Sequence, residues 1–144
     1  MMFEKLKELR DYEAKTQKET ATLLDVERAT YAGWECGKDI IPLLKLNDLA
    51  NFYQVTLDYL VGLTETQEKR SKKIDIDPIA ISDNIKMIRL KNHLSQKDFG
   101  ATLNTSQSNI HKYENGKSLI TTMYALELAK NYNFKLDEII QKRK

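Results

Sequence analysis

The stretch Thr105–Lys117, T-S-Q-S-N-I-H-K-Y-E-N-G-K, has the pattern of a short helix with a small polar outer face. Ser106 can cap its N-terminus, because a serine hydroxyl accepts a hydrogen bond from a free backbone N–H of the first turn. Ile110 and Tyr113 are three residues apart and share the buried face. The run Glu114–Gly116 ends the helix, since Asn and Gly tolerate the backbone conformation that follows a helix.

The outer face of this helix carries Gln107, Ser108, Asn109 and Lys112. Gln and Asn can bond adenine through two hydrogen bonds, Ser can bond several base edges, and Lys favours guanine or phosphate. An ordinary amphipathic surface helix with a solvated polar face has the same composition. The residues that precede the helix decide between these two interpretations.

A second short helix is predicted over residues 96–103. Ser95 and Asp98 form a close relative of the capping box, with Asp in place of Glu or Gln. Asn104 stands at the break, where a tight corner needs a residue that tolerates positive φ. Gly100 is small enough to let two helices cross closely. A helix, a tight corner and a helix with a polar outer face form the geometry that inserts its second helix into a major groove.

Residues 82–140 resemble the helix-turn-helix domain of the phage repressor and Cro group, also called the xenobiotic-response-element family. The resemblance rests on Ser95-Gln96, Gly100, Asn104, Ile110, Tyr113-Glu114-Asn115-Gly116-Lys117 and Leu128-Ala129. It implies a regulator of transcription that binds double-stranded DNA in a sequence-specific manner.

The resemblance also implies roles for individual residues. The Gln that opens the second helix of such domains bonds a phosphate and braces the reading helix, which corresponds to Gln96 and, less closely, to Gln17. The implied base readers are Gln107, Ser108 and Lys112, with Ser106 and Asn109 beside them. The implied phosphate contacts after the reading helix are Asn115, Lys117 and Thr121. In this family an Arg of the first helix often pairs with the Glu that closes the third, which corresponds to Arg89–Glu114 and Arg10–Glu35.

The chain contains an internal repeat with an offset of 79 residues. In this ungapped register the matched pairs include Arg10 with Arg89, Gln17 with Gln96, Glu35 with Glu114, and Gly37-Lys38 with Gly116-Lys117. Apolar residues follow helical spacing in both copies, and no useful strand-like alternation is present. The sequence therefore predicts an all-α fold with two tandem five-helix repressor-like domains, residues 1–65 and 81–144.

Residues 66–80 are predicted to form a charged linker between the two domains. Pro78 disfavours helix at the residue before it. The cluster Lys69-Arg70-Lys72-Lys73 could contact phosphates or lie along a minor groove, as basic arms do. A solvated linker is the more common role of such a run.

Charge distinguishes the two copies. Residues 1–65 carry eight Lys/Arg against twelve Asp/Glu, a net charge of −4. Residues 82–144 carry eleven against six, a net charge of +5. Because neutralisation of phosphates dominates non-specific affinity, we expect the second domain to be the main DNA reader.

The first domain also departs from the second on its own reading helix. Glu27 stands in the place of Ser106, a carboxylate in a phosphate-rich groove, and Gly33 replaces Lys112. The residues that could still contact DNA from this domain are Gln17, Arg28, Thr30 and Lys38. The alternative is a domain kept for protein contact, dimerisation or regulation.

Composition excludes other classes of protein. A single cysteine, Cys36, excludes an internal disulfide framework and suits a reducing cytosol, so we expect a cytoplasmic protein. No apolar run is long enough to span a membrane, and the N-terminus lacks a signal-peptide pattern. His93 and His111 are the only histidines, and neither has metal-ligand spacing to a cysteine. The five glycines are scattered and form no phosphate-binding loop. We expect no catalysis, no metal and no cofactor.

Two classes of function remain. The first is a DNA-binding transcriptional regulator whose partner is double-stranded DNA. The second is an antitoxin or anti-repressor that uses this fold mainly to hold a protein. Family members usually bind as dimers on half-sites about 34–36 Å apart, so either a homodimer or one chain spanning both sites fits the sequence. We favour the arrangement in which only the second domain touches DNA. The operator, the effector and any protein partner are not encoded in a recognisable motif.

Overall fold

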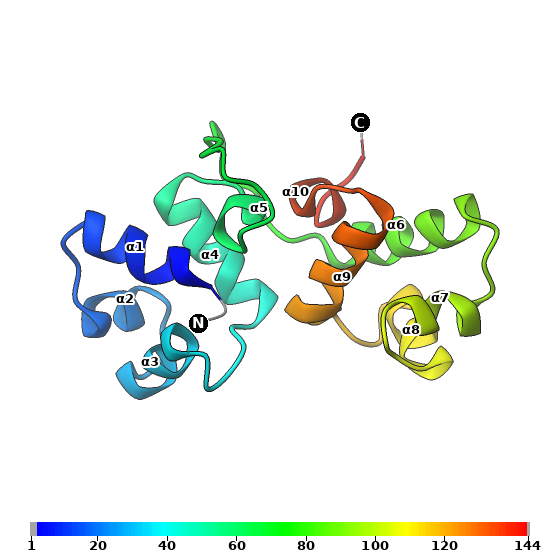
Figure 1. Ribbon diagram of the computed structural model, residues 1–144, viewed down its shortest axis with the longest axis horizontal. Coiled ribbons are helices and arrows are strands. Elements are labelled where there is room, and N and C mark those ends of the chain that lie inside the picture. The colour runs from blue at the N-terminus through cyan, green and yellow to red at the C-terminus, as the bar shows by residue number, and fades with distance from the viewer. Residues whose placement is uncertain (1–2, 144) are drawn as a thin grey trace. The chain divides into compact units, whose positions relative to one another are not determined.

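The computed structural model describes residues 3–143, and this part of the chain is helical with no named strand. It divides into two compact units, 1–74 and 75–144. The helices of the first unit are α1 (Glu4–Tyr12), α2 (Gln17–Leu23), α3 (Arg28–Cys36), α4 (Leu43–Tyr53) and α5 (Leu57–Leu60). Those of the second are α6 (Pro78–Lys91), α7 (Gln96–Thr102), α8 (Gln107–Glu114), α9 (Thr122–Tyr132) and α10 (Leu136–Ile139). Each unit therefore has five helices, whose succession can be followed in Figure 1, and this confirms the predicted all-α tandem fold.

Short polar side chains begin most of these helices. At α2 the Thr16 hydroxyl accepts from the Glu19 N–H, and the Glu19 carboxylate accepts from the Thr16 N–H, a complete capping box. At α7 the Ser95 hydroxyl accepts from the Asp98 N–H at 3.0 Å. Asp77 caps α6 in the same way, and Pro78 occupies the first turn, where its missing N–H is not needed.

The internal repeat recurs in the backbone as well as in the side chains. The non-glycine residues with positive φ form three pairs at the offset of 79: Ala14 with His93, Asp25 with Asn104, and Gln54 with Asn133. Gly37 and Gly116 are a fourth pair, with φ of 84° and 73°. Such φ values are uncommon outside glycine, so their recurrence shows that both copies make the same corners.

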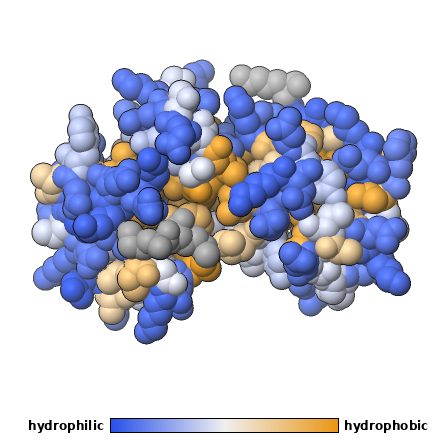
Figure 2. Space-filling view, in the orientation of Figure 1, coloured by the Kyte–Doolittle hydropathy of each residue, from blue (hydrophilic) through white to orange (hydrophobic). Residues whose placement is uncertain are grey.

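Each unit buries its own apolar core. In the first unit Leu6, Tyr31 and Leu46 are completely buried, and in the second Ile85 and Phe99 are. Trp34 is 6% exposed, so it packs in the core of the first unit. Hydrophilic residues cover most of the visible surface of each unit, and apolar residues appear in smaller patches (Figure 2). Burial of one face of each short helix is what stabilises it, because helices of this length are marginal alone.

The structure differs from the predicted linker, 66–80, at both of its boundaries. Residues 66–74 belong to the first unit. Lys69 forms an isolated antiparallel β-bridge with Val55, and the Arg70 N–H donates to the Gln54 carbonyl at 3.0 Å. At the other end α6 begins at Pro78, and the Asp77 N–H donates to the Ile140 carbonyl within the second unit. Ile74 is bonded within the first unit and Asp77 within the second, so only residues 75 and 76 lie between them. The connection is therefore far shorter than predicted.

Two asparagines of α4 hold residues 66–74 in place. The buried Arg70 guanidinium donates through Nη1 to Asn47 Oδ1 and Asn51 Oδ1, each at 2.8 Å. Both amide groups also donate to the Ile74 carbonyl, at 2.9 and 2.8 Å. Arg70 is 6% exposed and therefore does not join a solvated basic arm. The sequence pattern missed this because the Arg partners lie on a helix about twenty residues earlier.

Candidate nucleic-acid interface

The corner between α7 and α8 is tight, and its backbone explains the residues found there. Asn104 has a φ of 59°, and the Thr105 N–H donates to the Gly100 carbonyl at 2.9 Å. A Cβ on Gly100 would lie 2.9 Å from the Thr105 carbonyl oxygen and 3.1 Å from that of Ser106. Glycine is therefore required for the approach of the two helices, as predicted from the sequence.

A buried ion pair fixes α8 against α6. The Arg89 guanidinium donates through Nε to Glu114 Oε2 at 2.7 Å and through Nη2 to Oε1 at 3.0 Å. The side chains of Arg89 and Glu114 are 12% and 3% exposed. Arg89 Nη1 also donates to the Leu94 carbonyl at 3.0 Å. The hydrogen bond with Glu114 raises the pKa of Arg89, so the guanidinium stays charged. This confirms the predicted pairing.

Gln96 joins this pair from the start of α7. Its Nε2 donates to Glu114 Oε1 at 3.3 Å, so one carboxylate receives donors from α6 and α7. The half-buried Gln96 side chain is thereby held between the corner and the end of α8. Gln96 therefore braces the end of α8, as the family resemblance implied. The phosphate bond implied for the same residue stays a prediction.

The outer face of α8 presents most of the predicted base readers to solvent. Gln107, Ser108 and Lys112 are exposed. Ser106 is exposed too, and its hydroxyl accepts from the Asn109 N–H at 3.1 Å as the N-cap. Asn109 differs, because it is half-buried and its Nδ2 donates to Thr105 Oγ1 at 2.8 Å. That donor is occupied within the corner, so Asn109 supports the shape of the face more directly than the other four residues.

The segment after α8 offers side chains rather than backbone donors. The N–H groups of Asn115, Gly116 and Lys117 donate to carbonyls of α8, at 3.0, 3.4 and 3.0 Å. A phosphate would therefore meet the exposed side chains of Asn115, Lys117 and Thr121. Thr121 also accepts from the Tyr124 N–H at 3.4 Å as the N-cap of α9.

His111 also belongs to this surface, although it was not among the predicted DNA contacts. It is exposed on α8, one turn after Gln107, and its Nε2 lies 2.8 Å from Asn115 Nδ2. In that contact the Asn115 amide nitrogen donates to the imidazole nitrogen. Its helical spacing from Gln107 was the available signal.

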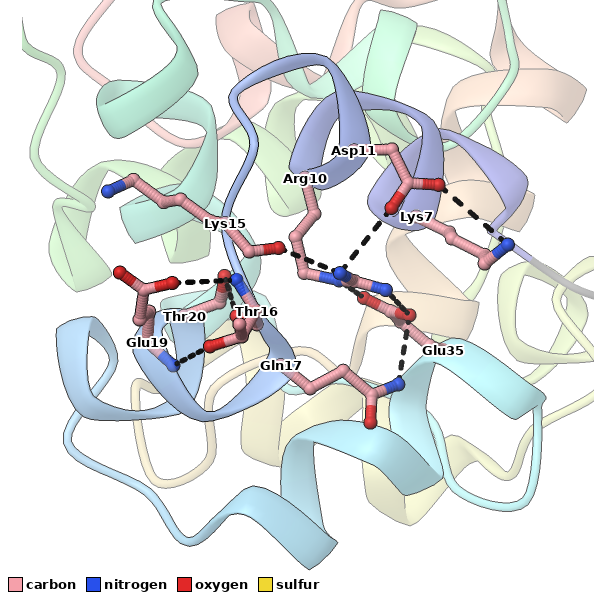
Figure 3. Close-up of polar contacts among 9 residues, drawn as sticks. All are labelled: Lys7, Arg10, Asp11, Lys15, Thr16, Gln17, Glu19, Thr20 and Glu35. Carbon is pink, nitrogen blue, oxygen red and sulfur yellow. Dashed lines mark hydrogen bonds and ion pairs between the residues drawn. The ribbon is translucent and has the colours of Figure 1, made fainter.

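The first unit repeats the buried brace (Figure 3). Arg10 donates to Glu35 at 2.7 and 3.1 Å and to the Lys15 carbonyl at 2.8 Å, and Gln17 Nε2 donates to Glu35 Oε1 at 3.1 Å. Burial raises the pKa of the Glu35 carboxyl, but the hydrogen bonds from Arg10 and Gln17 outweigh it, and the net pKa is lowered. Both copies thus build the same scaffold behind the third helix.

The outer face of α3 carries fewer groups for DNA than α8. Arg28, Thr30 and Lys38 are exposed, as a DNA contact requires. Glu27 occupies the N-cap position, but its side chain makes no cap hydrogen bond and is exposed. Gly33 is buried, and a Cβ there would lie 3.2 Å from Asp39 Oδ2. The face therefore combines two carboxylates with a small number of possible base contacts.

The structural boundary reduces the charge contrast between the units. Residues 1–74 hold twelve Lys/Arg and thirteen Asp/Glu, a net charge of −1, and residues 75–144 hold eleven and eight, a net charge of +3. The second unit remains the more basic one. The reduction arises because the basic run 69–73 belongs to the first unit and because Asp75 and Asp77 belong to the second.

The arrangement of residues 3–143 also bears on other kinds of site. No group of three or more His, Cys, Asp or Glu side chains is arranged to hold a metal ion there. Within the same residues no helix has the length and apolar character needed to cross a membrane.

Comparison with known proteins agrees with this geometry. The profile of the helix-turn-helix family matches residues 6–60 and 85–139, two segments separated by the offset of the repeat. The uncharacterized HTH-type transcriptional regulator YobD of Bacillus subtilis (strain 168) is 30% identical over 73 residues, which are 51% of this chain and 65% of that protein. No solved structure matches the chain. Because the family profile covers most of both units, the chain belongs to the Cro/C1-type helix-turn-helix family, with two tandem copies of the domain.

Proposed function

We propose that this protein is a transcriptional regulator that binds double-stranded DNA and reads its sequence with α8 of the second unit. The observation that carries the proposal is the row of exposed polar side chains on α8, held by a corner and an ion pair that leave the helix little freedom. The relative YobD is itself described as an HTH-type transcriptional regulator. A rigid polar helix of this kind can enter a major groove without a large ordering cost.

Each exposed side chain of α8 has a distinct part in the proposal. Gln107, at the first turn, donates and accepts at one adenine edge, and Ser108 bonds a neighbouring base. Lys112 reaches guanine or a phosphate one turn further along. Asn115, Lys117 and Thr121 bind the phosphates that flank the groove and fix the register of the helix.

Selection of bound sequences from a random DNA pool, followed by gel shifts with variants, tests the reading role. Gln107→Ala should weaken binding to the selected site by roughly 1–3 kcal/mol and relax the preference at one base position. The matched change in the first unit, Arg28→Ala, should leave the preferred sequence unaltered. Equal loss on selected and random DNA would show that Gln107 is not a base reader.

We also propose that the second unit makes most of the phosphate contacts. The plot of log K against log salt counts these contacts, with a slope of about −0.9 for each phosphate neutralised. Neutralising Lys112 and Lys117 together in the full chain should therefore flatten the slope by about 1.8. Neutralising Arg28 and Lys38, two exposed cations of the first unit, of which Lys38 matches Lys117 in the repeat, should change the slope by less than half of that amount. Equal flattening by the two pairs would show that both units lie on the duplex.

A further inference from the structure

The first unit exposes apolar side chains at positions where the second unit is polar. Leu23, the last residue of α2, is 47% exposed, and Phe52 of α4 is 39% exposed. At the offset of 79 the second unit has Thr102 and Asn131. The Asn131 side chain bonds the backbone at position 102, since its Nδ2 donates to the Thr102 carbonyl at 2.7 Å. The difference at this pair is specific to one copy of a shared fold.

The apolar residues form one surface with charged neighbours. A shallow hollow of about 420 Å³ is lined by Lys15, Lys18, Glu19, Thr22 and Leu23. The Lys15 ammonium also lies 5.3 Å from the centroid of the Phe52 ring, so Lys15 connects the hollow to the phenyl group. We call these six residues the α2/α4 patch. Figure 3 shows that the Lys15 and Glu19 side chains extend to the same side, away from the buried Arg10–Glu35 pair.

We propose that the α2/α4 patch pairs with the same patch of a second copy of this chain. A two-fold interface must be self-complementary, because each surface meets itself after the rotation. The patch meets this condition, since an apolar centre, Leu23 and Phe52, is bordered by both signs of charge, Lys15 and Lys18 with Glu19. Across a two-fold axis Lys18 of each chain can face Glu19 of the other chain while the apolar centres exclude water.

The proposal gives the first unit a function that does not depend on base reading. It accounts for the exposed apolar side chains of Leu23 and Phe52, whose equivalent positions in the second unit are Thr102 and Asn131. It also places two basic second units in one particle, which raises the avidity for two half-sites. The DNA-binding surface of α8 contributes no residue to the patch.

The test is sedimentation of the full chain across the micromolar range, with a variant built from the protein's own second unit. Leu23→Thr together with Phe52→Asn installs the polar pair that the fold already carries at 102 and 131. The parent should sediment as a dimer at the upper concentrations, and the double variant should raise the dissociation constant at least about tenfold. The control is Leu90→Thr, which changes a leucine that is 53% exposed in the second unit and should leave the dimer intact.

A second variant covers the case in which the double variant fails to fold by circular dichroism. Thr22→Arg adds a charge next to Leu23 within the patch without removing a buried group, since Thr22 is exposed. It should also yield the monomer. A parent that stays monomeric, or a folded patch variant that associates as tightly as the parent, would overturn the proposal. Gel shifts on the selected site separate this from the DNA-binding proposal, because the monomeric variants should keep the same base preferences.

Discussion

Replacing Glu114 by alanine is the sharpest test of how the second unit is built. The carboxylate accepts two hydrogen bonds from Arg89 and one from Gln96, and the Glu114 side chain is only 3% exposed. Its removal leaves a guanidinium charge, itself 12% exposed, without its counter-charge. An uncompensated buried charge is the costly consequence, more than the loss of the attraction itself.

The expected destabilisation follows from this geometry. Breaking a buried pair by removing one partner typically costs about 3–5 kcal/mol. Arg89 keeps its bond to the Leu94 carbonyl, so we expect the lower end, about 3 kcal/mol. For a unit of this size that corresponds to a fall in Tm of about 12–24 °C. Replacing both partners, Arg89→Met with Glu114→Leu, should cost less than Glu114→Ala alone, because no buried charge remains.

The position of the single tryptophan makes the assay specific to one unit. Trp34 lies in the core of the first unit, so its fluorescence follows the unfolding of that unit. Circular dichroism follows the helices of both. Glu114→Ala should introduce an early transition in circular dichroism and leave the Trp34 transition in place. Glu35→Ala, the equivalent change in the first unit, should shift the Trp34 transition instead.

Two results would contradict this reasoning. A Glu114→Ala variant within about 0.5 kcal/mol of the parent would mean that the ion pair contributes no more than an ordinary surface residue. An equal shift of the Trp34 transition in both variants would mean that the two units unfold as one, and the cost could not be assigned to the second unit alone.

Three other changes test separate parts of the structure. Gly100→Ala places a Cβ 2.9 Å from the Thr105 carbonyl oxygen and should destabilise the second unit by about 1–3 kcal/mol in urea denaturation; a variant as stable as the parent would show that the corner can widen. Glu35 has a pKa below its usual value of 4.5, so its contribution to stability is present above pH 4.5 and lost as the pH falls through the folded-state pKa. Acid titration of the Trp34 signal should be flatter for Glu35→Gln, and identical titration curves would remove Glu35 as the cause. Arg70→Ala removes the donor shared by the Asn47 and Asn51 side-chain oxygens, so segment 66–74 should become sensitive to trypsin at Lys72. Unchanged digestion would show that these hydrogen bonds do not hold the segment in place.

Local residue choice was enough to predict much of this protein. The capping serines and threonines, the apolar spacing and the residues at the corners predicted the helices and the tandem repeat, because each acts over one turn of chain. The pairings Arg89–Glu114 and Arg10–Glu35 were also predicted, through resemblance to a family that shares them. The exposed positions of Gln107, Ser108 and Lys112 followed from helical geometry alone.

Contacts between residues distant in sequence could not be predicted from local residue choice. Arg70 belongs to a charged run that has the composition of a solvated linker, and only folding brings it between Asn47 and Asn51 of α4. The bond from Asn109 to Thr105 spans only four residues, and it occupies a donor that the helical pattern placed on the outer face.

The sequence by itself determined the helices, the repeat and the family, since these depend on spacing and on side-chain chemistry within a few residues. The tertiary structure decided where the units divide and which polar groups stay accessible. The physical reason is that a buried charge or amide must be satisfied by whichever partner the fold brings within hydrogen-bonding distance, and distance along the chain does not encode that partner.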